Sequence, residues 1–286
     1  MKCSQAFLLV GLIYSQLCHS VQTKLEGPYL GQKPPSLIPQ AFAPGIVSTK
    51  GWEYGGVFTP DMKEFYFLRE SKADKKQEFV VFQFKNNNWH ESIVSPRRGQ
   101  PFISPDGKIM HLGKRFKHRT ATGWSDIKSL GPEFDELPIM RLTSSINGTY
   151  VFDDADREGN GILRYSRLVK GQREAPKPLS KEINTGTWNA HPFIAADESF
   201  IMWDGVREGG YGNSDIYISF KQSDGSWGAA INLGENVNTA QWEAAAGITP
   251  DGKYLFFSRN TGSEKHPNID IFWVDAKVIE NLRLKL

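Results

Sequence analysis

The sequence contains very little cysteine. Its 286 residues include only two, Cys3 and Cys18, and both lie among the first twenty residues. Those twenty residues have the features of a secretory signal, so we expect the mature chain to hold no cysteine. This excludes a disulfide framework, a cysteine–metal site and a thiol nucleophile for the mature chain.

An excess of one charge and long apolar runs are also missing. The chain has 34 Lys and Arg against 32 Asp and Glu, a formal net charge of +2. Charge alone therefore predicts neither a nucleic-acid partner nor an acidic membrane surface. After the first twenty residues, no apolar run is long enough for a transmembrane helix. Motifs for phosphate binding, dinucleotide binding and a serine-hydrolase elbow are absent from the sequence as well.

The first twenty residues predict export. Lys2 supplies a positive start, residues 6–14 form a short apolar core, and Cys18-His19-Ser20 places small residues before a cleavage site at Val21. We expect a periplasmic or secreted protein. Lipidation of Cys18 is the alternative, although Gln16-Leu17 is an unfavourable approach to a lipidated cysteine. The expected organisation is a signal peptide at 1–20, an N-terminal extension at 21–37 and one domain at 38–286.

One short segment recurs five times along that domain. Its copies contain a turn followed by an apolar run, and their anchors lie 41 to 54 residues apart. The copies are "TPDMKEFYFLRE" (59–70), "SPDGKIMHLGKR" (104–115), "SSINGTYVFDDA" (144–155), "AADESFIMWDGV" (195–206) and "TPDGKYLFFSRN" (249–260). A period near 45 residues is the size of a four-stranded propeller blade. Asp-Gly or Asn-Gly provides the positive φ that a tight hairpin needs.

The pattern predicts an all-β, five-bladed β-propeller. The fifth unit lacks a fourth strand and ends in "AKVIENLRLKL" (276–286), which has helical spacing, whereas "IPQAFAPGIVST" (38–49) resembles a fourth strand without a blade. We therefore expect the N-terminal strand to complete the last blade, because ring closure removes exposed sheet edges. A six-bladed ring is the alternative.

Residues 209–260, "GGYGNSDIYISFKQSDGSWGAAINLGENVNTAQWEAAAGITPDGKYLFFSRN", resemble the TolB-type, WD40-like β-propeller repeat of bacterial exported proteins. The resemblance extends over about residues 40–286, although the third unit departs from the Pro-Asp-Gly form. It implies a propeller and an envelope location. It does not imply one activity, because a fold of this kind serves many functions.

A second repeat precedes the blades. "VSTKGWEYGGVFTPD" (47–61), "INTGTWNAHPFIAAD" (183–197) and "VNTAQWEAAAGITPD" (237–251) align without gaps. In a propeller these segments lead into the strands that line the central channel, so their polar residues should meet at one mouth. The predicted ligand-binding residues are Trp52, Glu53, Arg98, Gln100, Arg141, Trp188, Asn189, His191, Trp242 and Glu243.

A structural role for the same residues is the main alternative. A tryptophan before a blade can pack between blades, and Glu or Asn can cap a preceding turn. If they bind a ligand, the site combines aromatic surface with polar groups, as ligand sites commonly do. The expected partner is then a glycan or an envelope protein, bound by a monomer.

A glycan-degrading enzyme is the second hypothesis. The candidate catalytic residues are Glu53, Glu243 and His191, since two carboxylates can cleave a glycosidic bond by acid–base chemistry. A polysaccharide lyase would instead need a base and an arginine. Some five-bladed propellers are glycoside hydrolases, but this sequence carries no motif specific to those families.

No metal or cofactor is expected. The exception considered is Ca²⁺ at Asp154, Asp156 and Glu158, where acids alternate before a glycine. The same segment is also explained as a hairpin turn, and it lacks the bidentate Glu of a calcium loop.

Overall fold

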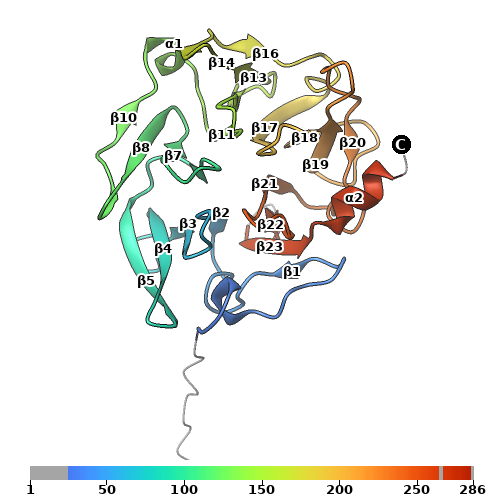
Figure 1. The fold of residues 1–286 in the computed structure, drawn as a ribbon. Coiled ribbons are helices and arrows are strands. Elements are labelled where there is room, and N and C mark those ends of the chain that lie inside the picture. Colours follow the sequence, from blue (N-terminus) through green and yellow to red (C-terminus); the bar gives the residue numbers. More distant parts are fainter. Residues whose placement is uncertain (1–24, 264–266, 285–286) are drawn as a thin grey trace, which may run out of the picture.

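The computed structural model describes residues 25–263 and 267–284. The predicted signal peptide at 1–20 lies outside the described residues. Five antiparallel sheets of the described chain are arranged as blades in a ring (Figure 1). The prediction of a five-bladed β-propeller is therefore confirmed.

The first two blades follow one another in the chain. Blade I has the strand order β2-β3-β4-β5, and blade II has the order β6-β7-β8-β10 with β9 paired to β8. The bounds in blade I are β2 Glu53–Phe58, β3 Glu64–Glu70, β4 Gln77–Lys85 and β5 Asn88–Pro96. Those in blade II are β6 Pro101–Ile103, β7 Ile109–Leu112, β8 Arg115–Thr120, β9 Gly123–Trp124 and β10 Lys128–Ser129.

Blades III and IV repeat the plan with shorter outer strands. Their orders are β11-β12-β13-β16 and β17-β18-β19-β20, and a separate hairpin β14-β15 extends blade III. Blade III contains β11 Leu142–Ser144, β12 Tyr150–Asp154, β13 Ile162–Ser166, β14 Leu168–Val169, β15 Gln172–Arg173 and β16 Lys177–Pro178. Blade IV contains β17 Thr187–Ile194, β18 Phe200–Val206, β19 Asp215–Phe220 and β20 Ile231–Asn232.

Blade V is closed by the N-terminal strand, as the sequence predicted. Its order is β21-β22-β23-β1, with β21 Glu243–Ile248, β22 Tyr254–Asn260, β23 Ile269–Asp275 and β1 Gln40–Ala41. In β1, Gln40 pairs with Trp273 and Ala41 with Phe272. Strands from the two ends of the chain therefore share one sheet, and this pairing covers the edge that β23 would otherwise expose.

The recurring Pro-Asp turn has one local explanation. The hydroxyl of Thr249 donates to Asp251 Oδ1 at 2.7 Å, and the N–H of Lys253 donates to the same oxygen at 3.3 Å. Asp61 and Asp106 accept equivalent hydrogen bonds in blades I and II. An Asp at this position therefore closes the hairpin between the first and second strands of a blade.

Aromatic packing holds the closure between blades V and I. Phe42, just after β1, is fully buried, and its ring contacts those of Phe65, Phe256 and Trp273 at centroid distances of 4.8–5.1 Å. The preceding extension joins this cluster through Tyr29, whose hydroxyl donates to Asp251. Residues 25–31 therefore pack against the ring.

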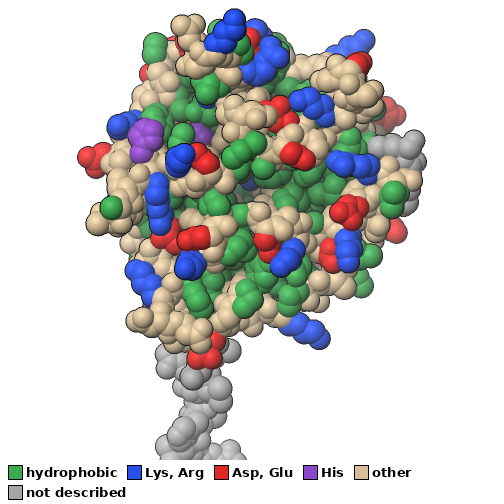
Figure 2. Space-filling model, viewed as in Figure 1, with side chains coloured by type: hydrophobic (Ala, Val, Ile, Leu, Met, Phe, Trp, Pro, Cys, Tyr) green, Lys and Arg blue, Asp and Glu red, His purple; other side chains and the backbone are tan. Residues whose placement is uncertain are grey.

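Helices are few among the described residues. They are the 3-10 helix η1 Tyr29–Gly31, the single turn α1 Pro132–Asp135, and α2 Lys277–Arg283, the short C-terminal helix that was predicted. None of the helices in the described part of the chain has the length and apolar character to cross a membrane. In the space-filling view, hydrophobic side chains surround the hollow at the centre of the ring (Figure 2).

Candidate functional site

Each blade contributes one residue at the same level of the channel, either from its first strand or from the position just before that strand. In each blade a backbone N–H closes the first hairpin, donated by Thr59, Ser104, Ser145, Ala195 and Thr249. Four residues before these positions lie Gly55, Gln100, Arg141, His191 and Ala245. Three of the predicted polar residues, Gln100, Arg141 and His191, thus occupy equivalent places in adjacent blades II, III and IV.

A β-bulge with positive φ marks this level in three blades. Gly55, His191 and Ala245 have φ values of 67°, 47° and 56°, and the register of β2, β17 and β21 shifts there. A positive φ is unfavourable for a non-glycine residue, so its neighbours must hold it in place. Bulges of this kind re-aim side chains and occur often beside functional sites.

Side chains from the neighbouring blade supply that support. The N–H of His191 donates to Asp153 Oδ2 at 3.0 Å, and the N–H of Ala245 donates to Asp204 Oδ1 at 3.0 Å. Gly55 N–H donates in the same way to the Ser258 hydroxyl at 3.1 Å. Asp153 and Asp204 are buried, and they connect blade III to IV and blade IV to V at the channel wall.

His191 and Asp204 form a pair within blade IV. Nδ1 of His191 lies 2.9 Å from Oδ2 and 3.1 Å from Oδ1 of Asp204, and the imidazole meets the Tyr54 ring edge-on at 5.8 Å. Burial by itself lowers the pKa of His191, but the nearby carboxylates of Asp204 and Asp153 outweigh it and raise the pKa above its ordinary value. No described residue bonds Nε2, so that nitrogen can meet a ligand.

Asp153 carries three hydrogen bonds from backbone amides. Besides His191 N–H, it accepts the N–H of Met140 at 2.7 Å and that of Arg141 at 3.1 Å. Burial raises the pKa of Asp153, against the opposing influence of His191 and these amides. Its oxygens are therefore occupied in holding the wall together.

A pocket of about 600 Å³ opens at this mouth of the channel. Its lining includes Tyr54, Trp188, His191, Asp204, Asn213 and Trp242. The side chain of Trp188 is 51% exposed, and a Cβ on Gly159 would lie only 2.6 Å from its ring, so the indole rests directly on that glycine. The pocket thus combines aromatic surface with an imidazole–carboxylate pair.

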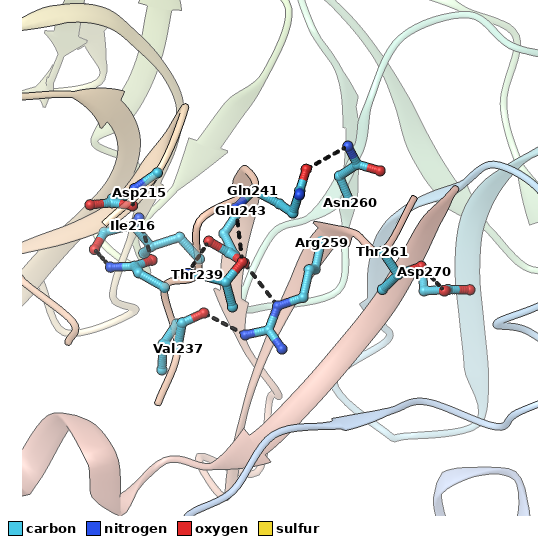
Figure 3. Close-up of polar contacts among 12 residues, drawn as sticks. Asp215, Ile216, Val237, Thr239, Gln241, Glu243, Arg259, Asn260, Thr261 and Asp270 are labelled. Atoms are coloured by element: carbon cyan, nitrogen blue, oxygen red, sulfur yellow. Dashed lines mark hydrogen bonds and ion pairs between the residues drawn. The ribbon is translucent and has the colours of Figure 1, made fainter. Parts of the chain in front are cut away.

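The two predicted glutamates lie in a different arrangement. Glu243 accepts the N–H of Thr239 at 2.9 Å and its hydroxyl at 2.7 Å, and pairs with Arg259 Nε at 2.8 Å (Figure 3). Glu53 accepts the N–H and hydroxyl of Thr49 at 3.1 and 2.6 Å. The repeated Thr-x-x-x-Glu spacing therefore locks the loop before each strand, and neither carboxylate lines the mouth pocket.

The remaining predicted residues also lie outside the pocket lining or contribute to it only indirectly. Asn189 is buried and accepts a hydrogen bond from the indole of Trp203 at 3.2 Å. Trp52 stacks on Tyr54 at 5.4 Å and so supports the pocket wall from behind, whereas Arg98 is exposed beyond β5. The structure brings together Trp188, His191 and Trp242 in the pocket, whereas Gln100 and Arg141 are buried and do not line it.

Tyr54, Asp153 and Asp204 were missed by the sequence prediction. The two aspartates share the tenth position of the aligned repeat units, where the other units have Leu68, Gly113 and Ser258. This position is apolar or small in three units and acidic in two. That difference was the feature of the sequence from which the two aspartates could have been found. Its meaning depends on the bulge in the next blade, which the sequence pattern did not reveal.

The residues considered for Ca²⁺, Asp154, Asp156 and Glu158, make local contacts. Asp154 pairs with Arg164 at 2.7 Å, and Asp156 Oδ1 accepts the N–H of Glu158 at 2.5 Å, as in a turn. Among the described residues, no three His, Cys, Asp or Glu side chains are grouped so that they could hold a metal ion.

Comparison with known proteins identifies the fold and no family. No protein-family model matches the sequence, and no curated protein matches it. One similar solved structure is the catalytic domain of a GH62 α-L-arabinofuranosidase from Coprinopsis cinerea, at 9% identity and a TM-score of 0.53, covering 84% of this chain and 97% of that one. An endo-arabinase from Bacteroides thetaiotaomicron matches at 13% identity and a TM-score of 0.48, covering 84% of this chain and 96% of that one.

TolB from Acinetobacter baumannii is also similar, at 16% identity and a TM-score of 0.46. The match covers 77% of this chain, and the chain spans about half of the TolB structure, 54% of its length. At these identities, the likeness concerns the fold alone. The five blades themselves confirm the propeller that the resemblance to TolB-type repeats implied.

Proposed function

We propose that this chain is an exported propeller that binds a glycan in the pocket at the channel mouth. The observation that carries the proposal is the pocket's lining, in which Trp188, Trp242 and Tyr54 surround the His191–Asp204 pair. A volume of about 600 Å³ lies within the range of ordinary small-molecule sites, roughly 300–1,000 Å³.

The chemistry of the lining suits a sugar. The C–H face of a pyranose or furanose ring is apolar and stacks on an indole, while its hydroxyl groups need hydrogen-bond partners. Half-exposed Trp188 offers such an aromatic face at the rim. The Nε2 of His191 offers a polar contact whose orientation is set from behind by Asp204. A pre-oriented side chain loses little conformational entropy on binding.

Export is part of the proposal because it rests on residues 1–20, whose sequence has the order of a secretory signal. An exported glycan-binding module would meet polysaccharide in the periplasm or outside the cell. An envelope protein bound at the same mouth is the competing partner, and the experiment below separates the two.

The test is a binding screen of the chain against a panel of neutral and acidic oligosaccharides by calorimetry. Trp188→Ala and His191→Ala should each weaken binding of any ligand found by about tenfold or more, since each removes a direct contact. His90→Ala, which removes an exposed imidazole from β5, is the matched control and should bind as the parent does. A silent panel, or unchanged affinity in both pocket variants, would reject the proposal in favour of a protein partner.

A second candidate function is glycan degradation at the same pocket. The observation that favours it is the contact between Asp204 and Nδ1 of His191, which fixes the imidazole as a base with Nε2 free for proton abstraction. Glu53 and Glu243 do not contribute to this candidate because their oxygens are bonded within their own loops. Product formation that disappears in His191→Ala would support catalysis, and binding without product would support the module alone.

A further inference from the structure

A second, smaller cavity lies on the axis of the ring. It has a volume of about 20 Å³, and all five blades contribute to its wall. The contributing residues include Phe58, Phe102, Arg141, Phe193, Gly247 and Phe256. A cavity of roughly 10–15 Å³ already accommodates one water molecule, so this one has room for a single small species.

Arg141 is the one charged group in that wall. Its side chain is buried, with 5% exposure, and its Nη2 approaches Gly247, where a Cβ would lie 3.3 Å away. Both Nε and Nη1 are inaccessible to solvent and have no hydrogen-bond partner among the described residues. Two donors on a permanently charged guanidinium are therefore unsatisfied in the centre of the protein.

The nearby acids do not supply the missing partner. Asp153 gives its oxygens to the N–H groups of Met140, Arg141 and His191, and Asp204 gives its oxygens to Ala245 N–H and to the His191 imidazole. Neither forms an ion pair with the Arg141 side chain within the described chain. Burial lowers the pKa of Arg141, and both carboxylates are close enough to oppose that effect. A buried charge without a direct partner is strongly unfavourable, so a counter-ion at this place would stabilise the fold.

The rest of the wall distinguishes an anion from water. A buried water is stable when two to four polar groups bond to it, and its own hydrogens need acceptors. The Thr249 hydroxyl, the other polar side-chain group of the wall, already donates to Asp251. Four phenylalanine rings make up much of the remaining surface, and the edges of such rings carry partial positive charge. An anion needs no acceptor and matches both the guanidinium donors and the ring edges.

We infer that the axial cavity is a binding site for a small monovalent anion of chloride size, held by the buried guanidinium of Arg141. The inference is independent of glycan binding at the mouth, because the anion sits deeper in the channel and touches a different set of residues. Such an ion would join the five inner strands at their centre, and so act on stability.

The first test is thermal unfolding of the full chain at constant ionic strength, with sodium gluconate replaced stepwise by sodium chloride. Above the dissociation constant, each tenfold rise in chloride should raise Tm by roughly 3–5 °C, because the ion binds the folded state alone. Gluconate is too large for the cavity and provides the baseline. Arg141→Met should abolish the chloride dependence, while Arg98→Met, at an exposed arginine, should retain it.

A crystal grown or soaked with sodium bromide provides a test that needs no variant. An anomalous peak within hydrogen-bonding distance of the Arg141 guanidinium is the expected result. Equal Tm in chloride and gluconate, together with water or no density at that place, would overturn the inference. If Arg141→Met fails to fold, the bromide peak alone decides.

Discussion

Nδ1 of His191 lies 2.9 Å from Oδ2 of Asp204, and this contact spans the first two strands of blade IV. The same carboxylate accepts the N–H of Ala245 from blade V. One side chain thus orients the imidazole in the mouth pocket and connects two blades. The chemistry of the site and the closure of the ring therefore depend on the same residue.

Asp204→Asn should lower the pKa of His191. Burial alone lowers that pKa, and the Asp204 carboxylate is the largest influence that raises it, so removing the charge leaves burial dominant. An NMR titration of the His191 ring measures the change. Asp74→Asn, at an exposed turn of blade I, is the control and should leave the His191 titration as it is.

The same pair predicts a pH dependence of stability. The pKa of His191 is raised in the folded state, so its contribution is fully present below the unfolded value of about 6.5 and is lost as pH rises through the folded pKa. Urea unfolding across that range should show this loss in the parent and not in Asp204→Asn. A loss of equal size in both proteins would contradict the assignment to this pair.

Glu243→Gln should destabilise the fold by about 2–4 kcal/mol, because it leaves the largely buried Arg259 without its ion-pair partner. The double variant with Arg259→Gln should cost less than the sum of the two single changes, since both remove one interaction. Urea unfolding of the four proteins gives this coupling. Strict additivity would show that the pair contributes nothing to stability.

Phe42→Ala should lower the free energy of unfolding by about 3–5 kcal/mol. The ring is fully buried among aromatic side chains from blades I and V, and truncation leaves a cavity where the propeller closes. Ile38→Ala, at a side chain that is 68% exposed, should change stability by no more than about 0.5 kcal/mol. Similar effects from the two variants would show that closure does not depend on this cluster.

His111 should make the fold sensitive to acid. The imidazole is fully buried in blade II without a hydrogen-bond partner among the described residues, and burial lowers the pKa of His111 to about 3. Because the unfolded chain then binds a proton that the folded chain cannot, stability should fall from about pH 6.5 downward, by up to about 1.4 kcal/mol per pH unit.

His111→Phe should remove that part of the acid sensitivity, since Phe has a similar shape and no proton to bind. Urea unfolding between pH 7 and pH 4 measures the slope in each protein. His118→Phe, at an exposed imidazole of β8, is the control and should keep the parent slope. An unchanged slope in His111→Phe would assign the acid sensitivity to other groups.

The repeat period and the turn chemistry were enough to predict the ring. Asp61, Asp106 and Asp251 close their hairpins with hydrogen bonds to residues two positions away, so the local sequence suffices to specify each turn. The unpaired segment at 38–49 and the incomplete fifth unit likewise predicted closure by β1. These features are local or periodic, and a pattern in one sequence can show them.

The candidate site was predicted only in part. Gln100, Arg141 and His191 were predicted to gather at one mouth of the channel, and they lie at equivalent positions of blades II, III and IV. The alignment grouped Glu53 and Glu243 with them, whereas their carboxylates bond to a threonine four residues earlier in each loop. Spacing alone did not distinguish a side chain that faces the channel from one that faces its own loop.

By itself, then, the sequence determined the number of blades, their order, the closing strand and the C-terminal helix. Only the tertiary structure decided which polar groups meet. Asp204 reaches His191 because β17 and β18 pair, and Asp153 supports His191 because blade III packs on blade IV. These contacts join residues tens of positions apart across bulges and blade boundaries. Their geometry follows from the closed ring, and no local pattern encodes it.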